Sequence, residues 1–195
     1  MDTLLAICLG VSLSAACGFR VFVPLLVMSI ASLSGHMTLA PGFQWIGTYP
    51  ALVTFSVATI AEIAGYYIPW VDHLLDTVAT PAAIVAGTVI TAAAVGDMSP
   101  FLKWSLAAIA GGGTAGLIQG TTVLARGLST ATTGGLGNPF FATIELCGAA
   151  FTSILAVMAP LLAVGMIGIV LFVLGRKILG KFRRVQPTAM PPVIS

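Results

Sequence analysis

The fold is decided around Ala15-Ala16-Cys17-Gly18-Phe19-Arg20-Val21-Phe22-Val23-Pro24, where a guanidinium and two helix-disrupting residues interrupt an otherwise apolar run. A charged side chain at the centre of a bilayer costs about 3 kcal/mol on the mildest scale, so Arg20 requires a partner, a cavity or an interface. Because Gly18 and Pro24 favour a break, we expect residues 4–34 to form two short helices hinged at Gly18. They form either a re-entrant hairpin or two crossings.

A similar pattern returns at Ala93-Ala94-Val95-Gly96-Asp97-Met98-Ser99-Pro100. The residues that follow the two prolines are also alike, in 24–35 and in 100–111. We interpret this similarity as an internal duplication.

The composition is that of a membrane protein. Of 195 residues, 58% are hydrophobic and only 7% are charged, whereas soluble domains carry about 25% charged residues. One helical span needs about 20 apolar residues, so this length allows six or seven spans and no separate soluble domain. We therefore predict an all-α, polytopic transmembrane helical bundle whose partners are membrane lipids.

The expected domain organisation is a transmembrane domain over residues 1–182 and a disordered cytoplasmic tail over 183–195. The domain divides into a first repeat (about 4–69), a second repeat (about 81–158) and an extra helix (about 161–181). Three crossings in each repeat would invert the second relative to the first. The basic residues Arg176, Lys177, Lys181, Arg183 and Arg184 follow the last apolar run, which places the C-terminus in the cytoplasm.

Two polar segments are predicted to lie outside the spans. Residues 71–80 read as a short amphipathic connector with Asp72 and Asp76 on one face, and we expect no metal site there. Residues 126–139 are rich in glycine and hydroxyl groups. They are interpreted as a cytoplasmic loop or as a re-entrant loop that lines a cavity, with Gly18, Thr133, Gly134, Gly135 and Asn138 as the possible lining residues.

The sequence does not indicate an enzyme. Cys8, Cys17 and Cys147 form no CxxC pair, and no Ser/His/Asp or Cys/His set is present, since His36 and His73 lie at predicted loops. We therefore expect no catalytic residue, no cofactor, no metal and no nucleic-acid partner.

The candidate site consists of Glu62, Glu145 and Arg20. Glu62-Ile-Ala-Gly65 aligns with Glu145-Leu-Cys-Gly148, and these are the only glutamates in the chain. In an inverted repeat such positions would meet near the midplane, where transporters keep their substrate and ion sites. Arg20 would pair with a glutamate or contact an anionic group. The alternative is a buried ion pair that only holds helices together.

Gly112, Gly116 and Gly120 recur every four residues in the second half. Such a ridge allows close helix approach. We expect it to serve packing, and it is also the predicted contact of a possible homo-oligomer.

The combination of Ala16-Cys17-Gly18-Phe19-Arg20 with Pro24, the run Thr132-Thr133-Gly134-Gly135-Leu136-Gly137-Asn138-Pro139, and Glu145 resembles a family of small polytopic bacterial membrane proteins described only as a domain of unknown function. The resemblance covers about residues 4–182 and implies an inner-membrane location with no known activity. The first hairpin is also similar to the Gly/Arg/Pro-containing re-entrant hairpins of lipid-carrier flippases, although it lacks the acidic residues of that family.

Three functions remain open at this point. The first is a bacterial inner-membrane transporter or channel-like protein that moves a proton, cation or small charged solute through Glu62, Glu145 and Arg20. The second is a flippase for a phosphate-bearing lipid, with Arg20 as the phosphate contact. The third is a non-catalytic membrane scaffold subunit.

Overall fold

The computed structural model describes residues 2–68, 71–96 and 98–184, and within these ranges the chain is helical and contains no strand. The elements are α1 (Thr3–Cys17), α2 (Phe22–Leu33), the 3₁₀ turn η1 (Gln44–Gly47), α3 (Tyr49–Tyr66), α4 (Val71–Ala94), α5 (Pro100–Leu106), the π-helical segment η2 (Ala107–Gly112), α6 (Gly113–Thr133), α7 (Asn138–Met158) and α8 (Pro160–Arg184). The predicted all-α bundle is confirmed.

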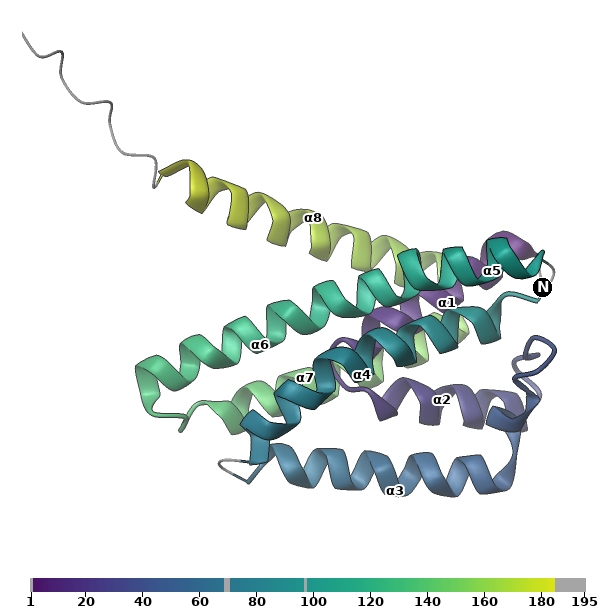
Figure 1. Cartoon of the computed structure of the whole chain (residues 1–195), viewed down its shortest axis with the longest axis horizontal. Helices are drawn as coiled ribbons and strands as arrows, with labels where there is room; N and C mark the ends of the chain where they lie inside the picture. The colour runs from purple at the N-terminus through teal and green to yellow at the C-terminus, as the bar shows by residue number, and fades with distance from the viewer. Residues whose placement is uncertain (1, 69–70, 97, 185–195) are drawn as a thin grey trace, which may run out of the picture.

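The first two helices form a half-length hairpin. Helix α1 has 15 residues and α2 has 12, which correspond to about 22 Å and 18 Å, less than the roughly 30 Å of a bilayer core. Both occupy the same half of the bundle, and their connection lies near its middle (Figure 1). The break predicted at Gly18 is therefore confirmed, and the two short helices form a hairpin with its tip at residues 18–21. Whether this hairpin is re-entrant or makes two crossings stays a prediction.

The remaining helices provide the long elements. Three described segments are long and apolar enough to cross a bilayer, namely Leu74–Ala94, Pro100–Thr133 and Asn138–Met158. The outward side chains on them, such as Ile109, Leu117 and Leu124, are large, apolar and exposed. Such a surface is what contact with lipid requires, because lipid tails are as apolar as leucine.

Small residues bring α1, α4 and the run Pro100–Thr133 together. A Cβ atom added to Gly87 would lie 2.7 Å from the Cβ of Ala115, and one added to Gly111 would lie 2.6 Å from the carbonyl oxygen of Gly87. The Ser14 hydroxyl donates to that same carbonyl at 2.6 Å and lies 2.8 Å from Thr91 Oγ1. Close backbone packing and interhelical hydrogen bonds hold helices together in lipid.

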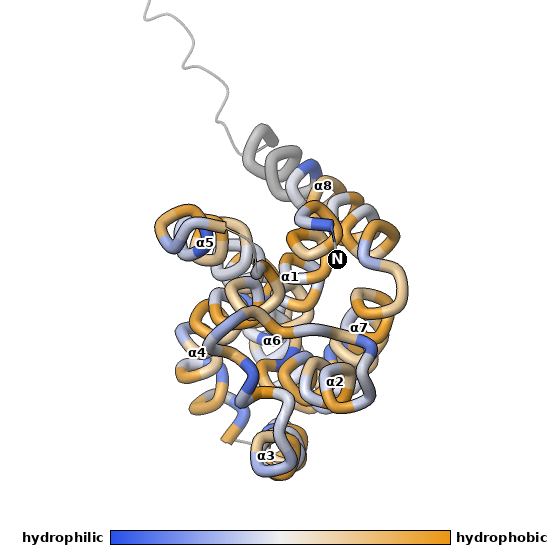
Figure 2. Tube along the Cα trace, turned by 90° about the vertical axis from the view of Figure 1, so that its right-hand side faces the viewer, coloured by the Kyte–Doolittle hydropathy of each residue, from blue (hydrophilic) through white to orange (hydrophobic). Residues whose placement is uncertain are grey.

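Figure 2, which looks along the bundle, places α3 at its edge. Helix α3 contacts α2, α4 and α7 there. It therefore covers α2 and the beginning of α4 on that side.

Two predicted loops are wrong. The expected connector at 71–80 belongs to α4, which is continuous and contains Pro81 inside it. The expected loop at 126–139 is mostly helix, since α6 continues to Thr133 and only four residues separate it from α7. Gly134 and Gly135 have φ values of +65° and +91°. This tight turn needs glycine there, because other residues rarely adopt a positive φ.

The predicted domain division stays a prediction. The last helix extends to Arg184, and residues 185–195 of the predicted tail lie outside the described residues. The inverted repeat stays a prediction. The helix that contains Pro24 ends at Leu33, whereas the helical run that starts at Pro100 continues to Thr133, so the two halves differ in the length of their second helical segment.

Candidate functional site

Buried charged side chains gather around the hairpin tip. Glu62 lies four residues before the end of α3, and Glu145 lies seven residues after the start of α7. A hydrogen bond of 2.7 Å between Tyr67 Oη and Thr143 Oγ1 ties these two helix ends together. The two glutamates therefore lie near the same pair of helix ends.

Arg20 reaches from the hairpin tip into this region. Its side chain is 1% exposed. Nη2 donates to the Ala142 carbonyl at 2.9 Å and lies 3.6 Å from Glu145 Oε2. Its guanidinium carbon stands 3.8 Å from the centroid of the Tyr66 ring, within the range of a cation–π contact. Arg20 thus joins the hairpin to α7 and α3.

Arg126 is a second buried guanidinium that the sequence analysis missed. Its side chain is 2% exposed and lies on α6. Nη1 is 2.8 Å from Asp76 Oδ1, and Nε is 3.2 Å from Glu145 Oε1. The guanidinium carbon also lies over Tyr66, 4.3 Å from the ring centroid. Glu145 therefore has a guanidinium on each side, and one aromatic ring supports both cations.

A periodic signal in the sequence could have revealed Arg126. The buried polar residues of α6 are spaced at helical intervals: Gln119, Thr122, Arg126 and Ser129. This spacing of three or four residues places them on one face of a helix. The glycine and threonine content of the following residues hid this pattern.

Glu62 has a different set of partners. Its Oε1 accepts the backbone N–H of Val21 at 2.8 Å, and its Oε2 accepts that of Phe22 at 3.1 Å. These N–H groups belong to the start of α2, where helical donors lack partners and the helix dipole favours a negative charge. Glu62 fixes the hairpin tip, and Glu145 alone lies between the arginines.

Asn138 extends the network toward the end of the bundle. It is 5% exposed. Its Nδ2 donates to Asp72 Oδ2 at 2.8 Å and to Thr130 Oγ1 at 3.1 Å. Asp72 is one helical turn from Asp76 on α4, and Thr130 is one turn from Arg126 on α6, so a polar group from α4, α6 and α7 adjoins the charged cluster.

The other residues predicted to line a cavity lie elsewhere. Gly18 is packed against α6, where an added Cβ would lie 2.5 Å from Ile118 Cβ and 2.6 Å from the Ala115 carbonyl oxygen. Thr133, Gly134 and Gly135 belong to the end of α6 and its turn, and the Thr133 hydroxyl accepts the Gly137 N–H at 3.1 Å. Of this predicted group, only Asn138 joins the buried network.

Residues 7–179 match the family described as Domain of unknown function (DUF4126). The chain belongs to this family. The match covers α2 to α7 entirely, with most of α1 and α8, and it includes every charged residue of the buried cluster. The predicted membership of an uncharacterised family is confirmed.

This DUF4126 protein has no significant match among curated proteins or among solved structures.

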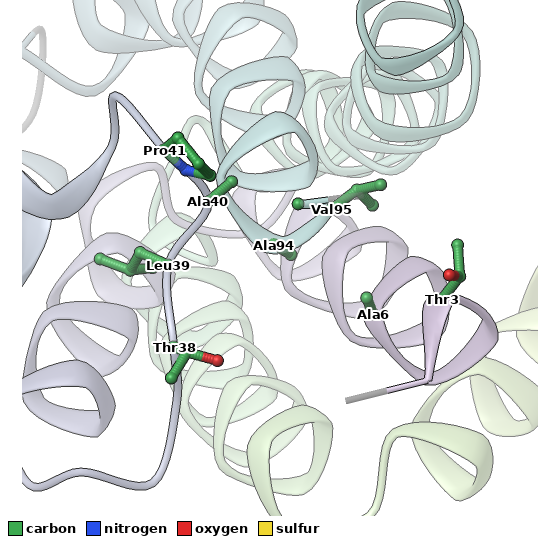
Figure 3. A pocket seen from close by; sticks show the side chains of 9 residues that line it. Thr3, Ala6, Thr38, Leu39, Ala40, Pro41, Ala94 and Val95 are labelled. Carbon is green, nitrogen blue, oxygen red and sulfur yellow. The ribbon is translucent and has the colours of Figure 1, made fainter. Parts of the chain in front are cut away.

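A cavity lies where the start of α1, the loop at residues 38–41 and the end of α4 meet (Figure 3). Its volume is about 180 Å³, and it is lined by Thr3, Ala6, Thr38, Leu39, Ala40, Pro41, Ala94, Val95 and Gly96. The backbone N–H of Ala40 donates to the Ala93 carbonyl at 2.8 Å and closes one side. The cavity holds no ionisable side chain, so the buried cluster is the stronger candidate for chemistry.

The predicted glycine ridge serves packing within the DUF4126 chain. An added Cβ would lie 2.5 Å from Thr88 Oγ1 at Gly112 and 3.1 Å from Ile84 Cγ1 at Gly116, whereas Gly120 faces open space. Homo-oligomer formation through this ridge stays a prediction. Among the described residues no group of three His, Cys, Asp or Glu side chains could hold a metal ion.

Proposed function

We propose that this protein is a membrane transporter or channel-like protein, and that Glu145 is the exchanging group of its solute site. The observation that carries the proposal is the position of the Glu145 carboxylate, held between the buried guanidiniums of Arg20 and Arg126 just beyond the tip of a half-length hairpin. The moving species is a proton, a cation or another small charged solute.

The depth of the charges supports transport over a purely structural role. Ionisable groups at membrane depth are costly, and they mark solute pathways more often than they stabilise a bundle. A buried ion pair contributes little net stability compared with apolar residues of the same volume. The hairpin tip adds non-helical backbone at the same depth, which is tolerated where it is buried in protein or lines a cavity.

The two ends of the bundle differ in a way that suits alternating access. Beyond the tip, polar side chains from α4, α6 and α7 lead from Arg20 to Asn138. On the hairpin side, α1, α4 and the run Pro100–Thr133 are in close backbone contact through Gly87, Gly111 and Ala115. A small separation of these backbones would connect the cluster to the other half of the bundle.

The orientation follows from the charges. The basic residues between Arg176 and Arg184 favour a cytoplasmic position for the end of α8, in keeping with the proposed location in a bacterial inner membrane. The turn between α6 and α7 lies at the same end of the bundle as the end of α8 (Figure 1). The charged cluster then faces the cytoplasm, and the N-terminus lies outside.

Flux through liposomes tests the proposal. Purified protein is reconstituted, and proton flux is followed with an internal pH dye while sodium, potassium, chloride or phosphate is supplied in turn. We expect wild type to carry protons with at least one of these solutes, and Glu145→Gln to fall to the level of protein-free liposomes. Lys103→Gln is the matched control, because Lys103 lies over the Phe43 ring away from the cluster. Equal flux in wild type, Glu145→Gln and protein-free liposomes would remove the proposal.

A further inference from the structure

We infer that Arg20 and Arg126 form a binding site for a phosphate-type oxyanion, and that the Glu145 carboxylate occupies this site in the resting protein. The inference rests on the proposed function in taking this cluster as the solute site, and it names the class of solute. It is tested by binding, so its failure is distinguishable from a failure of transport.

Both guanidiniums carry donors that no acceptor uses. Arg20 Nε and Nη1 and Arg126 Nη2 are buried and have no hydrogen-bond partner among the described residues. A guanidinium presents its N–H groups in a fixed planar fork, so these three nitrogens account for about five N–H donors. A buried donor without an acceptor costs about 1 to 3 kcal/mol, which a ligand rich in oxygen atoms would recover.

The donor geometry favours an oxyanion over a cation or a halide. Guanidinium forks bind carboxylate and phosphate groups through paired N–H···O contacts. Glu145 shows that this position accepts such a group, since its two oxygens face different arginines at 3.2 and 3.6 Å. The longer of these contacts exceeds ordinary hydrogen-bond length, and Glu145 Oε2 has no hydrogen-bond partner among the described residues. Glu145 therefore uses only some of the N–H donors of the two guanidiniums.

The site is filled by Glu145, so an incoming anion must replace it. Displaced from both arginines, a buried carboxylate would be left without a counter-ion, which is strongly unfavourable. The titratable and charged groups that face it are Arg20 from the hairpin, Arg126 from α6, Asp76 from α4, and Glu62 and Tyr66 from α3. Once the anion occupies both arginines, the neighbours left to Glu145 include the carboxylates of Asp76 and Glu62, which repel a further negative charge. We therefore expect Glu145 to take up one proton as the anion binds. Anion binding and proton uptake are thereby coupled.

Phosphate binding measures this directly. Protein in phosphatidylcholine nanodiscs is titrated with inorganic phosphate by calorimetry in two buffers of different ionisation enthalpy. We expect wild type to take up more protons per phosphate bound than Glu145→Gln, by about one. Glu145→Ala removes the internal competitor and should bind phosphate at least about tenfold more tightly than wild type. Arg20→Lys keeps the charge but loses the fork, and it should weaken binding at least about tenfold.

Thermal unfolding gives a second measure of phosphate binding, which can still be read if the removal of Glu145 destabilises the protein. Phosphate should raise the unfolding temperature of Glu145→Ala more than that of wild type, and chloride at equal ionic strength should not. The double variant Arg20→Ala/Glu145→Ala should lose this response, and Lys103→Gln should behave as wild type.

The oxyanion could belong to a free solute or to a lipid headgroup, and a second arm separates the two sources. Nanodiscs that contain phosphatidic acid, a lipid with a phosphate monoester, are compared with pure phosphatidylcholine nanodiscs. Stabilisation of Glu145→Ala by phosphatidic acid alone assigns the site to a lipid phosphate, and stabilisation by inorganic phosphate assigns it to a solute. Absence of any Arg20-dependent response to either phosphate would overturn the inference.

Discussion

Arg126 Nε lies 3.2 Å from Glu145 Oε1, and this contact joins α6 to α7 inside the bundle. The same guanidinium reaches Asp76 on α4 through Nη1 at 2.8 Å. One side chain therefore links three helices at the charged cluster.

Removing Arg126 should destabilise the bundle strongly. Arg126→Ala leaves Glu145 and Asp76 without their shared cation, and breaking a buried pair in this way costs about 3 to 5 kcal/mol. The double variant Arg126→Ala/Glu145→Ala should lose less stability than the sum of the two single variants, because it removes both members of the pair. Unfolding free energies from denaturant titration in mixed micelles check this. Strictly additive losses would contradict the coupling.

Glu62 should matter for the hairpin more than for solute exchange. Glu62→Ala leaves the N–H groups of Val21 and Phe22 without acceptors, and we expect a loss of about 2 to 4 kcal/mol in unfolding free energy. Glu62→Gln keeps one acceptor and should lose less. Thermal unfolding in detergent provides the comparison, and an unchanged midpoint for Glu62→Ala would show that these contacts do not hold the tip.

The hairpin tip should tolerate no side chain at position 18. Gly18→Ala places a Cβ against the Ala115 carbonyl and Ile118, and overpacking of this kind costs about 1 to 3 kcal/mol. Gly113→Ala is the matched control, since nothing lies within 4 Å of its added Cβ. That variant should be neutral or gain up to about 1 kcal/mol. Equal midpoints for the two variants would contradict the close packing of the end of α1 against α6.

Tyr66 should act through its ring. Both guanidinium carbons lie within 4.3 Å of the ring centroid, and a desolvated cation–π contact is worth about 2 kcal/mol. Tyr66→Phe keeps the ring and should therefore retain more stability than Tyr66→Leu by at least about 1 kcal/mol. The difference is read from unfolding midpoints of the two variants. If Tyr66→Phe lowers the unfolding midpoint as much as Tyr66→Leu does, the stabilising contact of Tyr66 is made by its hydroxyl group.

The sequence was sufficient to predict the charged residues within apolar segments and the first helix break. Arg20, Glu62 and Glu145 stand out because charges are rare in apolar spans, and Gly18 with Pro24 correctly located the helix break. The sequence also placed both glutamates near one another. Their carboxylates meet at the hairpin tip, Glu62 from near the end of α3 and Glu145 from near the start of α7. Their position at the membrane midplane stays a prediction.

The rest depended on tertiary packing that residue types do not encode. Asp76 and Pro81 suggested a connector, yet α4 runs through both because Ala79 and Ala83 are buried against neighbouring helices. Arg126 lies next to a stretch rich in glycine and threonine, which reads locally as a loop. The helical spacing of the buried polar residues on α6 does predict a helix there. The partners of that face, Asp76 and Glu145, come from other helices and are known only from the tertiary structure.

The most direct test of the account is whether the buried cluster can be reached from one water phase. Cys8, Cys17 and Cys147 are replaced by alanine, Glu145→Cys is introduced, and a charged, membrane-impermeant thiol reagent is added to sealed vesicles of either orientation. We expect labelling from the cytoplasmic side alone, while Leu13→Cys in the hairpin core stays unlabelled from both sides. Protection of Glu145→Cys from both phases, equal to that of Leu13→Cys, would contradict this expectation.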